Sequence, residues 1–299
     1  MRRYWSSVIE PLLTAFGPRT VVEIGSHLGV NTANLLTYCH QAGATLHAID
    51  PAPEYDVEEW TALHAPRLVA HRATSLEALP ALEGYEAVLI DGDHNWYTVF
   101  HELGLVDESC RVTGEPFPLV LLHDVGWPYG RRDLYYDPDA IPAPHRQPYA
   151  QGGLLPDRSE LCPNAGLNQD FYHATHEHGP RNGVLTAVED FIHQTAHDVD
   201  FFVLPPIHGL SILYGTARLG NPDFRAAIAD VRLSERHQAL TEMAESHRLD
   251  AELRLRAHVS EAQARTQMRQ QKTEERAAAH ARALAAARNP GVVDQESCS

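Results

Sequence analysis

The sequence predicts an α/β fold with a mostly parallel sheet, a long insert and a helical tail. Short β-branched runs alternate with helix-forming stretches through residues 20–124, a pattern typical of parallel strands joined by right-handed crossovers. Residues 125–180 are rich in proline, tyrosine, aspartate and glycine, which indicates an irregular insert. Residues 223–289 contain no glycine or proline and are dominated by helix formers.

Each strand and helix can be placed from its own run of residues. Strands are expected at 20–26, 44–50, 67–73, 85–91 and 118–124, with helices at 31–43, 57–64 and 96–110 between them. After the insert, an amphipathic helix is expected at 182–199, followed by strands at 201–205 and 209–215. Only three residues join these last two strands. Because so short a link cannot hold a crossover helix, the final strand should run antiparallel.

The same divisions predict the domain organisation. Residues 1–215 should form one body, and the insert at 125–180 should act as a substrate lid, since an irregular segment of about 55 residues is uncommon in a compact domain. Residues 216–289 should form a helical tail, and residues 290–299 a disordered C-terminus. The apolar positions of the tail keep no clean heptad, so both a solvated helix and a dimerising or partner-binding helix remain open.

Composition excludes several classes of protein. The 299 residues carry a net charge of −16, and residues 1–215 alone hold 11 arginines against 28 acidic side chains. This balance argues against a general nucleic-acid binder. No run is long and apolar enough to cross a membrane, and residues 1–13 lack the apolar core of a signal peptide. The four cysteines are far apart, so we expect a cytoplasmic protein.

The first strand ends in a glycine motif that favours a nucleotide-like ligand. Glu23, Gly25 and Gly29 form the pattern ExGxxxG at the start of a helix, where glycine permits a sharp turn and a close approach to a ligand. The middle glycine of a dinucleotide site is missing, which disfavours a nicotinamide-dependent oxidoreductase, and Glu23 suits a cationic ligand. A plain structural turn is the alternative. Asp50 closes the second strand, where an acid can accept hydrogen bonds from a ribose.

On these residues the chain resembles the class I S-adenosylmethionine-dependent methyltransferases over about residues 15–215. The resemblance implies a Rossmann-like seven-stranded sheet in the order 3-2-1-4-5-7-6 with strand 7 antiparallel. It implies that the glycine loop lines the methionine part of S-adenosylmethionine, that Asp50 holds the ribose and that residues 73–75 lie near the adenine. The cofactor residues predicted in this way are Glu23, Gly25, Ser26, His27, Gly29, Asp50, Thr74, Ser75 and Asp91.

Two further motifs resemble a group of small-molecule methyltransferases. LIDGDHNWY closes the fourth strand at 89–97, and LHDV closes the fifth at 122–125. The pair resembles the signatures of macrocin-type sugar O-methyltransferases and cephalosporin-hydroxylase-like proteins, although one extra residue separates His94 from Tyr97. In several such relatives these acids hold a divalent metal. We therefore predict a Mg²⁺ or Mn²⁺ site at Asp91, Asp124 and His123, because carboxylates at neighbouring strand ends converge.

Methyl transfer to an alcohol also needs a base. Lys272 is the only lysine and lies in the tail, so a lysine base is excluded and histidine is the natural candidate. His94 and His123 are the best placed, with Asp124 beside them. His123 is open to two interpretations, since it can be a metal ligand, which would shift preference from Mg²⁺ toward Mn²⁺, Fe²⁺ or Zn²⁺, or a general base without a metal.

The insert supplies candidate residues for the acceptor. Trp127, Tyr129, Arg131 and Tyr149 suit a polyhydroxylated or carboxylated molecule through stacking and bidentate hydrogen bonds. The histidine run at 173–178 does not have the spacing of a standard metal site and is expected at the surface.

The sequence thus predicts an enzyme that methylates a hydroxyl of a small polar acceptor, a sugar or natural-product scaffold, with S-adenosylmethionine and a divalent ion. Homo-oligomerisation is expected, through the C-terminal helix if that helix pairs. The alternatives are a metal-independent N- or carboxyl-methyltransferase and a non-catalytic cofactor-binding scaffold in a biosynthetic complex.

Overall fold

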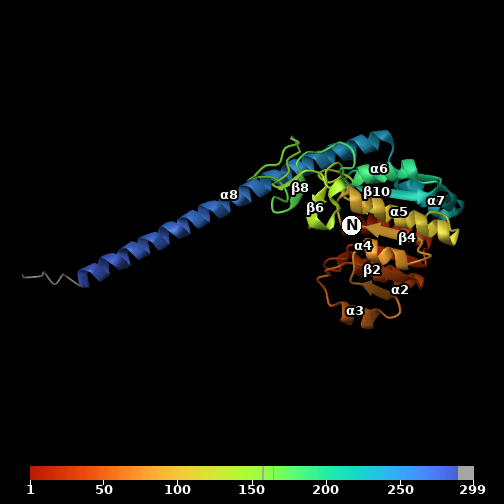
Figure 1. Ribbon diagram of the computed structural model, residues 1–299, viewed down its shortest axis with the longest axis horizontal. Coiled ribbons are helices and arrows are strands. Elements are labelled where there is room, and N and C mark those ends of the chain that lie inside the picture. Colours follow the sequence, from red (N-terminus) through yellow and green to blue (C-terminus); the bar gives the residue numbers. More distant parts are fainter. Residues whose placement is uncertain (157, 164, 289–299) are drawn as a thin grey trace, which may run out of the picture. The chain divides into compact units, whose positions relative to one another are not determined.

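A seven-stranded sheet forms the centre of the computed structural model, which describes residues 1–156, 158–163 and 165–288 (Figure 1). The strand order is β3-β2-β1-β4-β5-β10-β9. Numbering these seven strands along the chain gives 3-2-1-4-5-7-6, which confirms the predicted topology. The strands are β1 (Thr20–Ile24), β2 (Thr45–Ile49), β3 (Leu68–His71), β4 (Ala87–Ile90), β5 (Leu119–His123), β9 (Val199–Leu204) and β10 (Leu210–Gly215).

Helices cover both faces of this sheet because its strands are apolar on both sides. Along β1, Val21 and Val22 point to opposite faces and are both fully buried. On one face pack α1 (Glu10–Phe16), α2 (Val30–Ala42) and α7 (Pro222–Val231). On the other pack α4 (Ser75–Ala78), α5 (Trp96–Thr113) and α6 (Val184–Gln194). The helix α3 (Val57–His64) packs beside β3 at the sheet edge.

The last two strands form the predicted hairpin. The strand β10 runs antiparallel to both β5 and β9, with Leu210 opposite His123 on one side and Leu204 on the other. The turn of residues 205–209 therefore lies at the same edge as the carboxyl end of β5. This edge is where ligands bind in open α/β sheets.

The insert contains regular structure that the sequence did not predict. Residues of β6 (Leu134–Tyr135), β8 (Tyr172–Ala174) and β7 (Tyr149–Gln151) pair in that order as a small antiparallel sheet (Figure 1). The buried carboxylate of Asp133 fastens this sheet to the body by accepting hydrogen bonds from the backbone of Trp96 and Gly183 at 2.7 Å each. The expectation of an entirely irregular insert is therefore wrong, because strands of two or three residues leave no periodic pattern.

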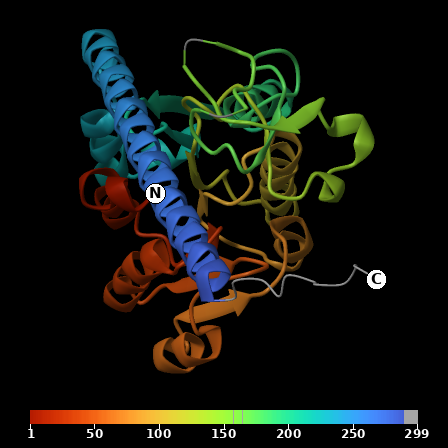
Figure 2. The same ribbon diagram turned by 90° about the vertical axis from the view of Figure 1, so that its left-hand side faces the viewer.

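The tail is helical, as predicted. After α7 the chain forms α8 (Glu235–Arg288), one uninterrupted helix (Figure 2). Two compact units divide the chain at Leu249 and Asp250, so the first turns of α8 belong to the body. The expected disorder of residues 290–299 falls outside the described residues. Among the described helices, none is both long and apolar enough to cross a membrane.

Candidate active site

The loop from Gly25 to Gly29 leaves β1 and passes unusually close to its neighbours. Gly25 has a φ of +86°, and a Cβ atom there would lie 2.4 Å from the carbonyl oxygen of Asp91. Gly29 has a φ of +74°, and its Cβ would lie 3.0 Å from the rings of Tyr55 and Trp60. Both positions require glycine, which accounts physically for the spacing of the motif.

The acid of this motif is buried beside the loop. Glu23 is 1% exposed, and its carboxylate accepts hydrogen bonds from Asn31 Nδ2 at 2.8 Å and Thr32 Oγ1 at 2.6 Å. Burial raises its pKa to about 7, although both hydrogen bonds act to lower it. Glu23 therefore ties β1 to the first turn of α2.

Asp50 lies just after β2 and organises the same loop. One carboxylate oxygen accepts a hydrogen bond from the backbone N–H of His27 at 2.7 Å and lies 3.4 Å from Ser26 Oγ. Its other oxygen accepts from the backbone of Ala52 at 2.8 Å. The structure thus brings the predicted residues Ser26, His27 and Asp50 together at one edge of the sheet.

The predicted residues after β3 begin the short helix α4. Thr74 caps this helix in a capping box with Glu77. Ser75 donates a hydrogen bond to Glu102 Oε1 of α5 at 2.5 Å. The Glu102 carboxyl is fully buried, its second oxygen has no partner among the described residues, and burial raises its pKa to about 8. The hydroxyl of Ser75 is therefore used inside the protein.

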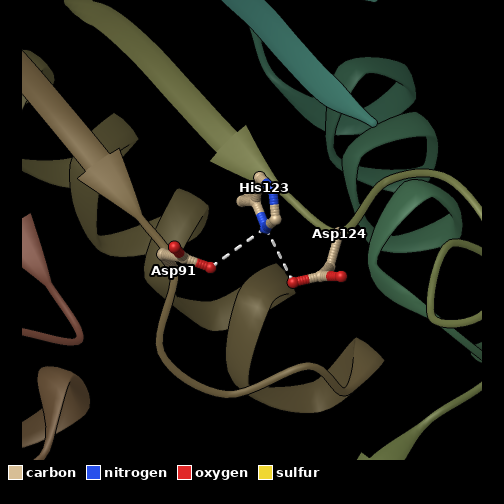
Figure 3. A group of neighbouring side chains, drawn as sticks. All are labelled: Asp91, His123 and Asp124. Carbon is tan, nitrogen blue, oxygen red and sulfur yellow. Dashed lines mark hydrogen bonds and ion pairs between the residues drawn. The ribbon is translucent and has the colours of Figure 1, made fainter. Parts of the chain in front are cut away.

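Three side chains from neighbouring strand ends meet at the carboxyl edge of the sheet (Figure 3). Asp91 follows β4, His123 ends β5, and Asp124 comes next with a φ of +60°. His123 Nδ1 lies 2.8 Å from Asp124 Oδ2 and 3.3 Å from Asp91 Oδ1. One ligand atom from each residue lies within 4.8 Å of the others, and this is the only such group of metal-ligating side chains found among the described residues. Two carboxylates and an imidazole fit a divalent cation.

The charges of this group are mutually dependent. Burial alone would lower the pKa of His123, but the carboxylates of Asp91 and Asp124 raise it to about 10. Conversely, burial would raise the pKa of both carboxyls, yet the neighbouring histidines hold both below their usual range. Without a metal, the two carboxylates therefore favour the protonated form of His123. The interpretation of His123 as a metal-free base is disfavoured on this ground.

His94 lies on the other side of Asp124. Its Nε2 is 3.5 Å from Asp124 Oδ2, its side chain is largely buried, and its ring stacks on Tyr129 at 5.4 Å. The ring of Tyr129 also stacks on that of His173 at 5.9 Å. His173 is fully buried, so the expectation that the whole histidine run lies at the surface is wrong for this residue. Asn168 donates a hydrogen bond to the Tyr129 hydroxyl.

The predicted acceptor residues of the insert have different surroundings. Trp127 lies in the segment of residues 124–130 that begins with Asp124 (the Asp124 segment), and its carbonyl lies 3.0 Å from His208 Nδ1. Arg131 makes two hydrogen bonds to Glu189 of α6, at 2.6 and 2.7 Å, so its guanidinium is engaged within the protein. Tyr149 is exposed on β7, where its ring contacts Tyr135 and Tyr172 of the small sheet. Of these four residues, Tyr129 has a ring that stacks on His94, next to Asp124.

Three aromatic residues near the site were not predicted. Tyr136 is 53% exposed, yet its ring lies 6.1 Å from that of His94 and meets Phe171 edge to face at 5.6 Å. The pKa of Tyr136 is raised, mainly because its hydroxyl is partly buried. Tyr129 and nearby carboxylates that include Asp124 also raise it. Tyr4, from the short 3-10 helix Arg2–Tyr4, packs edge to face on His123 with ring centroids 6.1 Å apart. No motif marks these residues; only their place in the folded chain does.

The N-terminal amino group also reaches this edge. Met1 N lies 2.8 Å from Asp91 Oδ2, with the Met1 side chain buried. This contact helps the histidines to hold the pKa of Asp91 low.

Comparisons with known proteins found similar solved structures but no similar curated sequence. Solved structures that resemble the chain include the SAH-bound methyltransferase PaMTH1 of Podospora anserina (13% identity, 69% of this chain and 76% of that chain, TM-score 0.40). A riboflavin-derivative dimethyltransferase, RosA of Streptomyces davawensis, is 17% identical (72% of this chain and 56% of that one, TM-score 0.40). Human N-acetylserotonin methyltransferase in complex with SAM is 14% identical (72% and 53%, TM-score 0.37). The chain thus spans only about half of the last two proteins.

A family model described as a methyltransferase domain matches residues 22–125. This range begins inside β1 and ends just past Asp124, so it holds the glycine loop, Asp50 and all three members of the candidate metal group. Residues 22–125 are therefore similar to a methyltransferase domain, and the strand order is the one implied by the resemblance to class I S-adenosylmethionine-dependent methyltransferases.

Proposed function

We propose that the chain transfers the methyl group of S-adenosylmethionine to a hydroxyl of a small polar acceptor, a sugar or natural-product scaffold, with the help of a divalent cation. The observation that carries the proposal is the convergence of Asp91, His123 and Asp124 at the ends of β4 and β5. A bound Mg²⁺ or Mn²⁺ would lower the pKa of an acceptor hydroxyl and orient it. The imidazole ligand favours Mn²⁺ over Mg²⁺.

The cofactor side of the site is proposed on the glycine loop and Asp50. The sulfonium of S-adenosylmethionine carries the methyl group to be transferred. Gly25 and Gly29 let the backbone turn without Cβ atoms, and Asp50 already accepts hydrogen bonds from the loop. A carboxylate in this place can bind ribose hydroxyls. Thr74 and Ser75 are proposed to border the adenine through their backbone, since both side chains have partners within the protein.

His94 is the proposed base for the acceptor hydroxyl. Asp124 lies 3.5 Å from its Nε2, and stacking on Tyr129 holds its ring. A carboxylate beside one imidazole nitrogen orients the ring and stabilises its protonated form after it accepts a proton. Tyr136 and Phe171 are proposed to form an aromatic wall that contacts the acceptor.

Metal binding tests the proposal directly. Isothermal titration with Mn²⁺ should show one site in the full-length protein, and Asp124→Asn should weaken binding at least about a hundredfold, because it removes a charged ligand. Both proteins should bind S-adenosylhomocysteine equally well, since Asp124 lies outside the glycine loop. Asp93→Asn is a matched control, because it removes a neighbouring carboxylate that does not belong to the metal group.

The outcomes separate the alternatives. Absence of Mn²⁺ binding together with S-adenosylhomocysteine binding would contradict the metal site and favour metal-independent N- or carboxyl-methylation. Turnover of a hydroxyl acceptor that is unaffected by a chelator would do the same. Binding of S-adenosylhomocysteine without turnover of any offered acceptor would favour the non-catalytic scaffold.

A further inference from the structure

The turn between β9 and β10 packs directly against the segment that carries Asp124. The backbone N–H of Gly126 donates a hydrogen bond to the His208 carbonyl at 2.6 Å, and His208 Nδ1 lies 3.0 Å from the Trp127 carbonyl. A Cβ on Gly209 would lie 2.6 Å from the Gly126 nitrogen. The two segments are therefore in backbone contact, and a shift of the turn would move the residues that follow Asp124.

This turn is strained and needs external support. Ile207 and His208 both have positive φ angles, +55° and +67°, which cost free energy in residues other than glycine. Near the N-terminus, the Tyr4 hydroxyl donates a hydrogen bond to the Pro206 carbonyl and lies 3.4 Å from the Leu204 carbonyl oxygen. Further support comes from the first turns of α8.

Glu245 of α8 provides that support with a buried carboxylate. Its Oε1 accepts a hydrogen bond from the backbone N–H of His208 at 3.0 Å, and its side chain is only 10% exposed. Arg248 donates to both carboxylate oxygens, at 2.7 and 2.8 Å, and its Nη2 lies 3.4 Å from His208 Nε2. Charge-assisted hydrogen bonds of this kind are stronger than neutral ones. The carboxylate therefore holds the turn in its left-handed conformation.

We propose that Glu245 is a positioning residue that holds the Asp124 segment in the geometry of the metal group, through the 205–209 turn. The first turns of α8 are then part of the active-site support. The inference rests on the proposed function for the metal, but the support of the 205–209 turn by Glu245 does not depend on a metal. Outer-shell partners of metal ligands commonly contribute 10–100-fold to metal affinity.

The experiment uses the full-length chain with three substitutions. Glu245→Ala removes both acceptor oxygens, whereas Glu245→Gln keeps one oxygen for the His208 N–H. Glu242→Ala is the control, since Glu242 is an exposed acid of the same helix one turn earlier. Hydrogen exchange by mass spectrometry follows the amides of residues 124–127, 129–130 and 207–209, and titration measures binding of Mn²⁺ and of S-adenosylhomocysteine.

Glu245→Ala should speed amide exchange in both segments at least about tenfold and weaken Mn²⁺ binding about tenfold, with unchanged binding of S-adenosylhomocysteine. Glu245→Gln should keep the exchange rates and the Mn²⁺ affinity close to those of the unmodified chain. Glu242→Ala should match the unmodified chain. Unchanged exchange in Glu245→Ala would overturn the inference. If the unmodified chain binds no Mn²⁺, the proposed metal site fails, while the exchange measurement still decides whether Glu245 positions the Asp124 segment.

Discussion

Tyr136 is the residue whose place in the structure says most about the acceptor. Its ring borders His94 and Phe171 and remains 53% exposed, so an acceptor next to His94 would contact it. An aromatic contact contributes about 0.5–1.5 kcal/mol. Tyr136→Ala should therefore raise the KM for the acceptor roughly three- to tenfold with little change in kcat, and Tyr136→Phe should keep the KM near its original value.

Tyr149→Ala is the informative comparison, because the sequence predicts Tyr149 as an acceptor residue while its ring contacts are to Tyr135 and Tyr172. We expect this variant to leave steady-state kinetics with the same acceptor unchanged. A KM that rises in Tyr149→Ala and not in Tyr136→Ala would reverse the assignment.

At the scale of single residues, a place at a strand end can be predicted from the sequence, whereas the partners of a residue in the insert cannot. Asp50, Asp91, His123 and Asp124 follow apolar runs, and the topology of parallel strands brings their side chains to one edge. Arg131 looks equally suited to a ligand in the sequence, but its partner Glu189 lies 58 positions away. Such pairings depend on how the insert folds back, which no local pattern encodes.

At the scale of elements, α4 and α5 meet at a carboxyl that should leave a pH signature. The pKa of Glu102 is raised from its ordinary value near 4.5 to about 8 by burial. Between these pH values the unfolded chain is ionised while the folded protein keeps the proton. The contribution of Glu102 to stability should therefore fall as the pH rises from about 5 to 8 and level off above that.

Glu102→Gln tests this expectation, because glutamine imitates the protonated carboxyl and still accepts the hydrogen bond of Ser75. The melting temperature of the variant, followed by circular dichroism, should decline less between pH 5 and 8 and exceed that of the unmodified chain at pH 8.5. Glu83→Gln, at an exposed position between α4 and β4, serves as the control. Parallel pH profiles for Glu102→Gln and the unmodified chain would refute a titration of Glu102.

The elements themselves were predictable in proportion to their length. Buried strands of four to six residues with helices between them produce clear apolar runs, so the central sheet was predicted with its antiparallel last strand. The strands β6, β7 and β8 have two or three residues each and are defined by their pairing. Their order depends on contacts such as that of Asp133 with Gly183, 50 positions apart.

At the scale of the whole molecule, the compact body extends beyond the boundary that composition suggested. The predicted body ends at residue 215, but Phe224 and Ile228 of α7 are buried in the core. Leu249 of α8 is 5% exposed, and the body as a compact unit ends there. Composition changes at residue 216 because helix formers begin there, whereas the limit of the body depends on which of their side chains are buried.

Two shortened chains test this limit. A chain of residues 1–249 should melt within about 2 °C of the full-length protein and bind Mn²⁺ and S-adenosylhomocysteine with the same affinity, because it keeps the complete body. A chain of residues 1–234 loses buried Leu249 and the Glu245 carboxylate. Loss of one large buried side chain costs about 2–5 kcal/mol, so its melting temperature should fall by several degrees or more. Scanning calorimetry measures both, and a 1–234 chain as stable as the full-length protein would show that α8 contributes nothing to the body.

Light scattering on the 1–249 and full-length chains tests the proposed self-association through the tail, which predicts a smaller oligomer for the shorter chain.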